Sequence, residues 1–258
     1  MLVTINWRWI TILVMHLSWM VTFSQRFNLT LAIVPITNRD YTSKTLSSGR
    51  EASHAWTELD KGNALASFYY GYVSTQFIGG YISDKVGGKH LIGTASFIGN
   101  ILTILTPTAV EKGLYSLIAL RVILGMSQGL VIPALLGLIS NWSSKSTVNC
   151  CTELVLCGTQ IAILFTSVIS YLSFGSRIFH GWPGLFYFQG ILGFATYLNW
   201  MIFVYNKPSD HPWISEEEIK LLENKALKRP QNIPWKKFFT NPAVIANYIA
   251  MFGYFSIR

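Results

Sequence analysis

Charged residues are scarce in this chain of 258 residues, of which Asp, Glu, Lys and Arg together make up 12%. Soluble globular proteins carry about 25% charged residues, and the mean hydropathy here is +0.37. Acids are the scarcer sign, with 12 Asp and Glu against 20 Lys and Arg. This composition is unlike that of a water-soluble domain and indicates that most of the chain faces an apolar medium.

Cysteine and histidine are also few, and neither is spaced for chemistry. The three cysteines, Cys150, Cys151 and Cys157, lie in one apolar run, where packing is a simpler interpretation than a disulfide framework or a metal site. The five histidines are scattered, and no nucleotide loop or nucleophile–base pattern appears. The sequence therefore gives no sign of an enzyme, a metal site or a bound cofactor.

Long apolar runs are what the chain has instead. They recur at about 20 residues, the length that a helix needs to cross a bilayer. Six spans are predicted, at 9–37, 63–82, 91–109, 114–140, 151–172 and 184–205, and a seventh begins at Pro242 and is cut off at Arg258. The first run lacks a small-residue cleavage site, so we do not expect a removable signal peptide. These runs predict an all-α membrane protein.

The basic residues are distributed unevenly between the loops. If the N-terminus is cytoplasmic, the larger set of Lys and Arg falls inside, as the positive-inside rule requires. The net charge of +8 then reflects topology, and no nucleic-acid partner is expected. The polar segment Thr37 to Lys61 is predicted to be an outer loop.

Three regions are predicted: a six-helix transmembrane bundle at 1–205, a cytoplasmic central loop at 206–241 and a truncated seventh span at 242–258. The central loop contains an amphipathic stretch. There we expect Ser215 to cap a helix and Glu218 to close a capping box.

Two arginines, Arg26 and Arg121, lie inside apolar runs. A charge at the centre of a membrane helix costs about 2.5–3.5 kcal/mol on insertion scales, and it is usually found facing a cavity, a partner or a ligand. Arginine cannot lose its proton to avoid that cost. Glu153 is the only acid within the predicted spans. Two cations without acids beside them indicate a pathway for an anion; the simpler alternative is that each side chain snorkels to the interface.

The segment Gly80 to Lys89, between the second and third spans, resembles the signature G-x-x-x-D-[RK]-x-G-x-[RK] of the major facilitator superfamily. The resemblance implies a gating role for Gly80, Asp84, Lys85, Gly87 and Lys89. Glycines permit close helix approach and a tight turn, and the carboxylate can pair with a cation or a helix N-terminus. An ordinary glycine-rich turn is the alternative.

Other segments resemble the solute carrier 17 family, also called anion:cation symporters, which includes type I sodium–phosphate cotransporters, sialin and vesicular glutamate transporters. The resemblance is carried by Gln25 to Thr30, Arg121 to Gly129 with Pro133, Gly181 to Pro183 with Phe186 and Tyr187, Pro208 to Pro212, and Pro234 to Lys236.

The chain also departs from the family pattern. Vesicular and lysosomal members usually carry an acid where this chain has Gln128, and glutamate-type members carry a histidine where it has Leu65. Both replacements look more like the sodium–phosphate and urate-type branch. A segment close to W-x-P-P-x-E-R is absent after the fourth span, where Trp142 to Lys145 follows directly.

The resemblance implies the N-terminal half of a major facilitator fold, built from two inverted three-helix repeats. The first and fourth spans are then equivalent, and each carries one arginine. At about 1.5 Å per residue, Arg26 lies roughly 15 Å and Arg121 roughly 10 Å below the outer ends of their spans. We predict that both bind a phosphate or an organic carboxylate through bidentate hydrogen bonds. Asn28 and Gln128 are the predicted uncharged contacts.

The implied protein is a secondary active transporter of inorganic phosphate or organic anions such as urate, in the plasma membrane or a vesicle membrane. No cofactor is expected, and sodium or the membrane potential drives transport. Alternating access needs two six-span halves, so we expect an incomplete sequence that lacks the C-terminal half. A transport-incompetent fragment is the alternative. A six-span homodimer is less favoured because of the aborted seventh span, and a channel would not explain the gating motif.

Overall fold

The computed structural model describes residues 6–37, 56–175, 181–223, 240–246 and 249–250. In these ranges the regular structure is helical, without strands, which confirms the predicted all-α fold. The elements are α1 (Trp7–Thr37), α3 (Glu58–Val86), α4 (Gly88–Lys112), α5 (Leu114–Gly129), α6 (Val131–Asn141), α7 (Val148–Leu156), α8 (Gly158–Gly175), α9 (Trp182–Phe203), the 3-10 helix η1 (Pro208–Asp210) and α10 (Glu216–Glu223).

Each of the six predicted spans coincides with helix. The fourth consists of α5 and α6, which are separated at Leu130; Pro133 has no N–H for the Gly129 carbonyl, which weakens the helix at this point. The fifth consists of α7 and α8, with Cys157 between them. Three stretches, Gly88–Lys112, Leu114–Asn141 and Val148–Phe174, are long and apolar enough by themselves to cross a membrane.

The second predicted span is longer than expected, because α3 begins at Glu58, inside the predicted outer loop. Thr57 and Asp60 form a capping box: the Asp60 N–H donates to Thr57 Oγ1, and the Thr57 N–H donates to Asp60 Oδ2. This capping box starts the helix in a polar segment. The remaining outer loop at 38–55, the segment Pro234 to Lys236 and most of the predicted seventh span lie outside the described residues.

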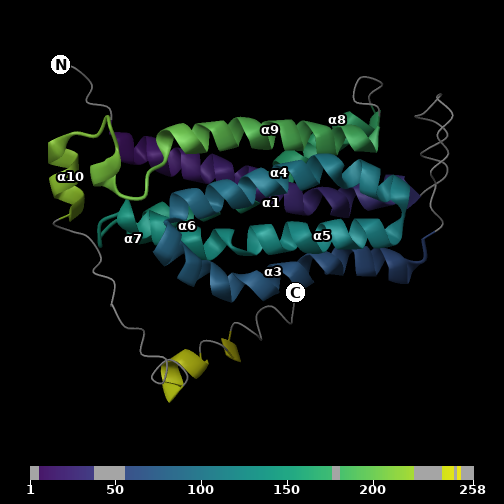
Figure 1. Cartoon of the computed structure of the whole chain (residues 1–258), viewed down its shortest axis with the longest axis horizontal. Coiled ribbons are helices and arrows are strands. Elements are labelled where there is room, and N and C mark those ends of the chain that lie inside the picture. Colours follow the sequence, from purple (N-terminus) through teal and green to yellow (C-terminus); the bar gives the residue numbers. More distant parts are fainter. Residues whose placement is uncertain (1–5, 38–55, 176–180, 224–239, 247–248, 251–258) are drawn as a thin grey trace. The chain divides into compact units, whose positions relative to one another are not determined.

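Residues up to Ala226 form one compact unit, and Leu227–Arg258 form another. In the first unit, α1 contacts α8, α9 and α7, while α3 packs against α5 and α6, and α4 against α5 and α9 (Figure 1). One apolar cluster surrounds Trp19 and Trp200, and a second surrounds Leu29 and Phe186. Buried polar residues of α1 and α9 lie between the two clusters along these helices.

Helices α3 and α5 approach so closely that side chains are excluded at three positions. A Cβ on Gly125 would collide with the Phe68 carbonyl oxygen, and one on Gly129 with that of Tyr72. On the facing helix α3, a Cβ on Gly71 would collide with the Val122 carbonyl oxygen of α5. Small residues at these positions allow the two helices to pack at close range.

The chain after α9 folds back onto the start of α1 and the end of α6. The His211 ring is 4% exposed, and its centroid lies 5.1 Å from that of Trp7, 5.6 Å from Trp142 and 5.0 Å from Tyr205. We call these four residues, with Trp213, the His211 cluster. It joins the central loop to α1 and α6.

Helix α10 follows this cluster. The Glu218 N–H donates to Ser215 Oγ at 3.3 Å, which confirms Ser215 as the N-cap. The Glu218 carboxylate, expected to close a capping box, accepts a hydrogen bond from the backbone N–H of Arg8 at 2.9 Å. The amphipathic helix of the central loop is thereby attached to the first turn of α1.

Candidate functional site

Arg121 lies at the centre of the bundle, on α5, and is 2% exposed. Its Nη2 donates a hydrogen bond to Asn28 Oδ1 of α1 at 3.1 Å, while its Nε is buried without a hydrogen-bond partner. Within the described part of the chain, no carboxylate forms an ion pair with it. The structure thus brings together two of the predicted site residues and leaves the charge of Arg121 unneutralised by an acid.

Asn28 in turn belongs to a chain of buried hydrogen bonds that crosses four helices. Asn28 Nδ2 donates to Gln189 Oε1 of α9 at 2.9 Å, and Gln189 Nε2 donates to Ser24 Oγ of α1 at 2.7 Å. Ser24 Oγ lies 2.7 Å from Thr166 Oγ1 of α8, which donates to a main-chain carbonyl within its own helix. We call this series, from Arg121 to Thr166, the amide chain.

A second buried amide pair lies beside the amide chain. Gln25 Nε2 of α1 donates to Asn100 Oδ1 of α4 at 2.7 Å. A Cβ on Gly193 of α9 would overlap Asn100 Oδ1, so only glycine leaves room for this pair. The pair fixes α1 against α4 and α9 without a hydrogen bond to Arg121.

Arg26 is held differently from Arg121. Its guanidinium carbon lies 4.4 Å from the ring centroid of Tyr72, 5.0 Å from that of Phe68 and 5.1 Å from that of Phe23. Its Nε and Nη2 are buried without a hydrogen-bond partner. Cation–π attraction to these rings stabilises the charge and leaves hydrogen-bond donors unused.

Gln128 is the remaining predicted contact. It is 2% exposed on α5, and neither atom of its amide has a hydrogen-bond partner within the described residues. It lies seven residues from Arg121, about 10 Å along the helix. The four predicted residues therefore do not form one hydrogen-bonded group: Arg121 and Asn28 are joined, whereas Arg26 and Gln128 stand apart with unused polar atoms.

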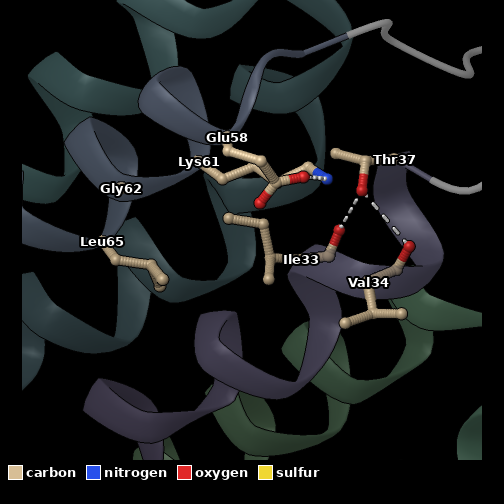
Figure 2. A pocket seen from close by; sticks show the side chains of 7 residues that line it. All are labelled: Ile33, Val34, Thr37, Glu58, Lys61, Gly62 and Leu65. Atoms are coloured by element: carbon tan, nitrogen blue, oxygen red, sulfur yellow. Dashed lines mark hydrogen bonds and ion pairs between the residues drawn. The ribbon is translucent and has the colours of Figure 1, made fainter.

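An open cavity of about 580 Å³ lies between the end of α1 and the start of α3 (Figure 2). It is lined by Ile33, Val34, Thr37, Glu58, Lys61, Gly62 and Leu65. Its charged groups are Lys61 and Glu58, which form an ion pair with Lys61 Nζ 2.7 Å from Glu58 Oε1. Leu65, expected where glutamate-type members carry a histidine, lines this cavity and also packs against the apolar cluster around Leu29 and Phe186.

The predicted gating motif forms the turn between α3 and α4. Gly87 has a φ of +90°, a conformation that favours glycine, and a Cβ there would meet the Asn206 side chain. The Lys89 N–H donates to Asn206 Oδ1 at 2.8 Å, and Lys89 Nζ lies 3.8 Å from the Tyr205 ring centroid. The turn is thereby held against the end of α9.

The other motif residues lie on α3. Asp84 and Lys85 are exposed on the last turn of α3, with Lys85 Nζ 4.6 Å from the Tyr81 ring centroid. A Cβ on Gly80 would make only ordinary contact with Pro133, whereas Gly79 is the position pressed against Leu130 and Pro133. The close helix approach falls on Gly79, one residue before the predicted glycine.

Gln189, Ser24 and Thr166 were not predicted as site residues. Each is polar within an apolar span, and Ser24 lies between Trp19 and Arg26 on α1. A lone amide in an apolar span needs a hydrogen-bond partner, and this signal could have identified Gln189. It could not have identified which partner.

The chain matches the Major Facilitator Superfamily over residues 8–257. It is 30% identical over 249 residues to the chloroplastic ascorbate transporter of Arabidopsis thaliana, covering 95% of this chain and 42% of that protein. It is 30% identical over 257 residues to vesicular glutamate transporter 3 of Danio rerio, with coverage of 95% and 42%. It is also 30% identical over 243 residues to the chloroplastic sodium-dependent phosphate transport protein 1 of Arabidopsis thaliana, with coverage of 93% and 44%.

The xylose transporter XylE from E. coli, in an inward open conformation, has a similar fold. The TM-score is 0.57 at 17% sequence identity, covering 84% of this chain and 52% of that chain. The chain thus spans less than half the length of these three curated relatives and about half of this solved structure. It is a multi-pass membrane protein that belongs to the major facilitator superfamily, and its relatives are anion transporters of the solute carrier 17 type.

Proposed function

We propose that this chain forms the N-terminal part of the anion site in a secondary active transporter of inorganic phosphate or an organic anion such as urate. The observation that carries the proposal is the state of Arg121. It is fully buried and hydrogen-bonded to a neutral amide, with no carboxylate paired to it in the described part of the chain. A buried cation without a counter-ion attracts an anion strongly, because the surroundings screen it weakly.

The unused donors of the other residues support the same proposal. Arg121 Nε, Arg26 Nε and Nη2 and the Gln128 amide are buried without partners. Phosphate and carboxylate oxygens match such donors geometrically. The relatives are named for phosphate, glutamate and ascorbate, all of which are anions at neutral pH.

The proposed transporter also needs a driving force to move the anion across the membrane. Transport of an anion is coupled either to sodium or to the membrane potential, which supplies about 2.3 kcal/mol per charge per 100 mV. The gating residues Gly80, Asp84, Lys85, Gly87 and Lys89 act at the α3–α4 turn. The N-terminus is cytoplasmic, in the plasma membrane or a vesicle membrane.

A second candidate follows from the length comparison. Alternating access in this fold uses two six-helix halves, and the chain spans 42–44% of the three relatives. In this candidate the 258-residue chain binds the anion without carrying it across the membrane.

The test measures binding and uptake separately. Radiolabelled phosphate, urate and glutamate are offered to the purified protein and to proteoliposomes, with and without sodium and with an imposed potential. Arg26→Ala and Arg121→Ala are compared with Arg8→Ala, which removes a buried arginine at the other end of α1.

We expect both site variants to lose binding and Arg8→Ala to retain it. Uptake by the wild type supports the carrier, whereas binding without uptake supports the second candidate. Wild-type anion binding by both Arg26→Ala and Arg121→Ala would contradict the proposed site. Failure of the wild type to bind any of the three anions would end the proposed function.

A further inference from the structure

We propose that Gln189 is a positioning residue that orients the Asn28 amide so that its oxygen faces Arg121. The inference rests on the proposed function insofar as Arg121 binds the anion. Its structural basis is the amide chain, in which Gln189 joins two residues of α1, Asn28 and Ser24, at 2.9 and 2.7 Å.

The direction of every hydrogen bond in the amide chain is determined from its two ends. At one end, the Arg121 guanidinium has donors only, so the group that it contacts must be the Asn28 oxygen. Asn28 therefore presents its NH2 to Gln189, which must accept with Oε1. This leaves the Gln189 NH2 to face Ser24.

The other end requires the same direction. Thr166 gives its single hydroxyl proton to the Ala162 carbonyl oxygen at 2.7 Å. It can therefore only accept from Ser24, 2.7 Å away. Ser24 has then used its own proton and is left to accept from Gln189 Nε2. Both ends agree, so the order of donors and acceptors is unique.

This order has an electrostatic consequence for Arg121. Every dipole in the amide chain points its negative end toward the guanidinium, and aligned hydrogen bonds strengthen one another. The cation is therefore stabilised by neutral groups from α1, α9 and α8, and its net charge remains available to an anion.

Replacing Gln189 would disrupt this order of donors and acceptors. Without Gln189, the Asn28 NH2 loses its buried acceptor, so the side chain is held by Arg121 alone and turns to other rotamers in which its oxygen leaves the guanidinium. The guanidinium would then lose its hydrogen bond and become mobile.

The first readout needs no anion. Phenylglyoxal modifies arginines, and peptide mass spectrometry resolves Arg121 from the others. In Gln189→Leu we expect modification of Arg121 to be at least about fivefold faster than in the wild type, the factor that corresponds to loss of one buried hydrogen bond. Asn100→Leu is the matched control, because it breaks a buried amide pair that does not reach Arg121.

The second readout is equilibrium binding of radiolabelled phosphate. Gln189→Leu should bind phosphate about five- to tenfold more weakly, and Asn100→Leu should bind as the wild type.

Gln189→Glu separates the positioning of Asn28 from the effect of an added charge. Its carboxylate still accepts from Asn28 and, once the Ser24 hydroxyl turns, from Ser24. Arg121 therefore stays slow to react, but the added negative charge weakens phosphate binding. Ser24→Ala is a milder variant that should move both readouts in the direction of Gln189→Leu, should the latter fail to fold.

Equal reactivity of Arg121 in the wild type, Gln189→Leu and Ser24→Ala would overturn the inference. Equal acceleration in Asn100→Leu would overturn it too, because general loosening would then explain the result. If the wild type binds no phosphate while Arg121 reactivity follows the expected pattern, the positioning role stands and phosphate binding fails.

Discussion

Asn28 is the residue that explains how a guanidinium can be buried in this bundle. Its oxygen accepts from Arg121 and its nitrogen donates to Gln189, so one amide satisfies two neighbours. An aspartate at this position would satisfy Arg121 equally well but would also neutralise it. In the proposed anion site, this neutral acceptor leaves the charge of Arg121 available to the anion.

Asn28→Asp and Asn28→Leu should separate these two effects. The aspartate should form a buried ion pair with Arg121 and abolish phosphate binding, although it loses the hydrogen bond that the Asn28 NH2 donates to Gln189. The leucine should lower the free energy of unfolding by about 1.5–3 kcal/mol, because a hydrogen bond to a charged group is lost. Thermal unfolding followed by tryptophan fluorescence and phosphate binding measure the two effects. Wild-type phosphate binding by Asn28→Asp would contradict this account.

His211 gives the protein a pH dependence outside the membrane spans. Burial lowers its pKa below the ordinary value of 6.5, outweighing the raising effects of the Phe203 backbone and the Glu218 carboxylate, and Lys89 lowers the pKa further. The folded state therefore favours the neutral ring. The unfolded state binds more protons below about pH 6.5, so stability falls as the pH drops from there through the folded pKa.

We expect the melting temperature of the wild type to fall between about pH 7.5 and pH 5.5, and His211→Phe to show a smaller fall because it has no titrating ring. Phenylalanine keeps an aromatic ring among Trp7, Trp142 and Tyr205. Other histidines titrate in both proteins, so the difference between the two profiles is the measured quantity. Parallel profiles would show that His211 contributes nothing to the pH dependence.

Among the elements, α3 and α5 form the closest-packed pair, and their glycines set the distance between them. This spacing places Phe68 and Tyr72 of α3 where they contact Arg26, and it brings Thr75 Oγ1 within 2.8 Å of the Met126 carbonyl oxygen. A change in the α3–α5 distance would therefore alter the support of one candidate site residue directly.

Gly125→Ala tests this packing. The added methyl group would meet the main chain of α3, which cannot rotate away, so the helices must separate. We expect a loss of about 1–3 kcal/mol in stability. Gly62→Ala on α3 is the matched control: nothing lies within 4 Å of its Cβ position, and alanine should stabilise the helix by up to about 1 kcal/mol. Equal melting temperatures of the two variants would contradict the close approach.

For the molecule as a whole, the bilayer reverses the usual distribution of side chains. Large apolar residues such as Phe77 and Leu164 are exposed, while Arg121, Gln128 and Gln189 are buried. Polar groups turn inward because lipid offers them no hydrogen bonds. The same arrangement places the amide chain between two apolar clusters.

The proposed orientation can be tested with single cysteines. Cys150 is exposed at the start of α7, whereas Cys151 is buried. With serine at Cys151 and Cys157, a membrane-impermeant maleimide should label Cys150 in inside-out vesicles but not in intact cells. A cysteine at Leu59, which is exposed at the start of α3, should show the opposite pattern in a background without other cysteines. Reversal of both patterns would invert the proposed topology.

Helices, spans and family were predictable because each rests on local features: the length of an apolar run, a capping residue or a short motif. The burial of Arg121 was predictable for the same reason, since a cation inside an apolar run has few alternatives. The start of α3 differs from the predicted start of the second span, because the capping box of Thr57 and Asp60 begins the helix before the apolar run.

The partners of these residues were not predictable, because they come from positions far apart in the chain. Asn28 is separated from Arg121 by 93 positions and from Gln189 by 161, and no periodicity within one helix specifies which face meets which neighbour. Composition and run length require helices in a membrane, with two cations inside apolar runs. Packing of α1 against α8 and α9, with Arg121 of α5 and two aromatic rings of α3 reaching it, assigns a neutral amide to one cation and aromatic rings to the other. Only the assembled bundle brings those groups within contact distance.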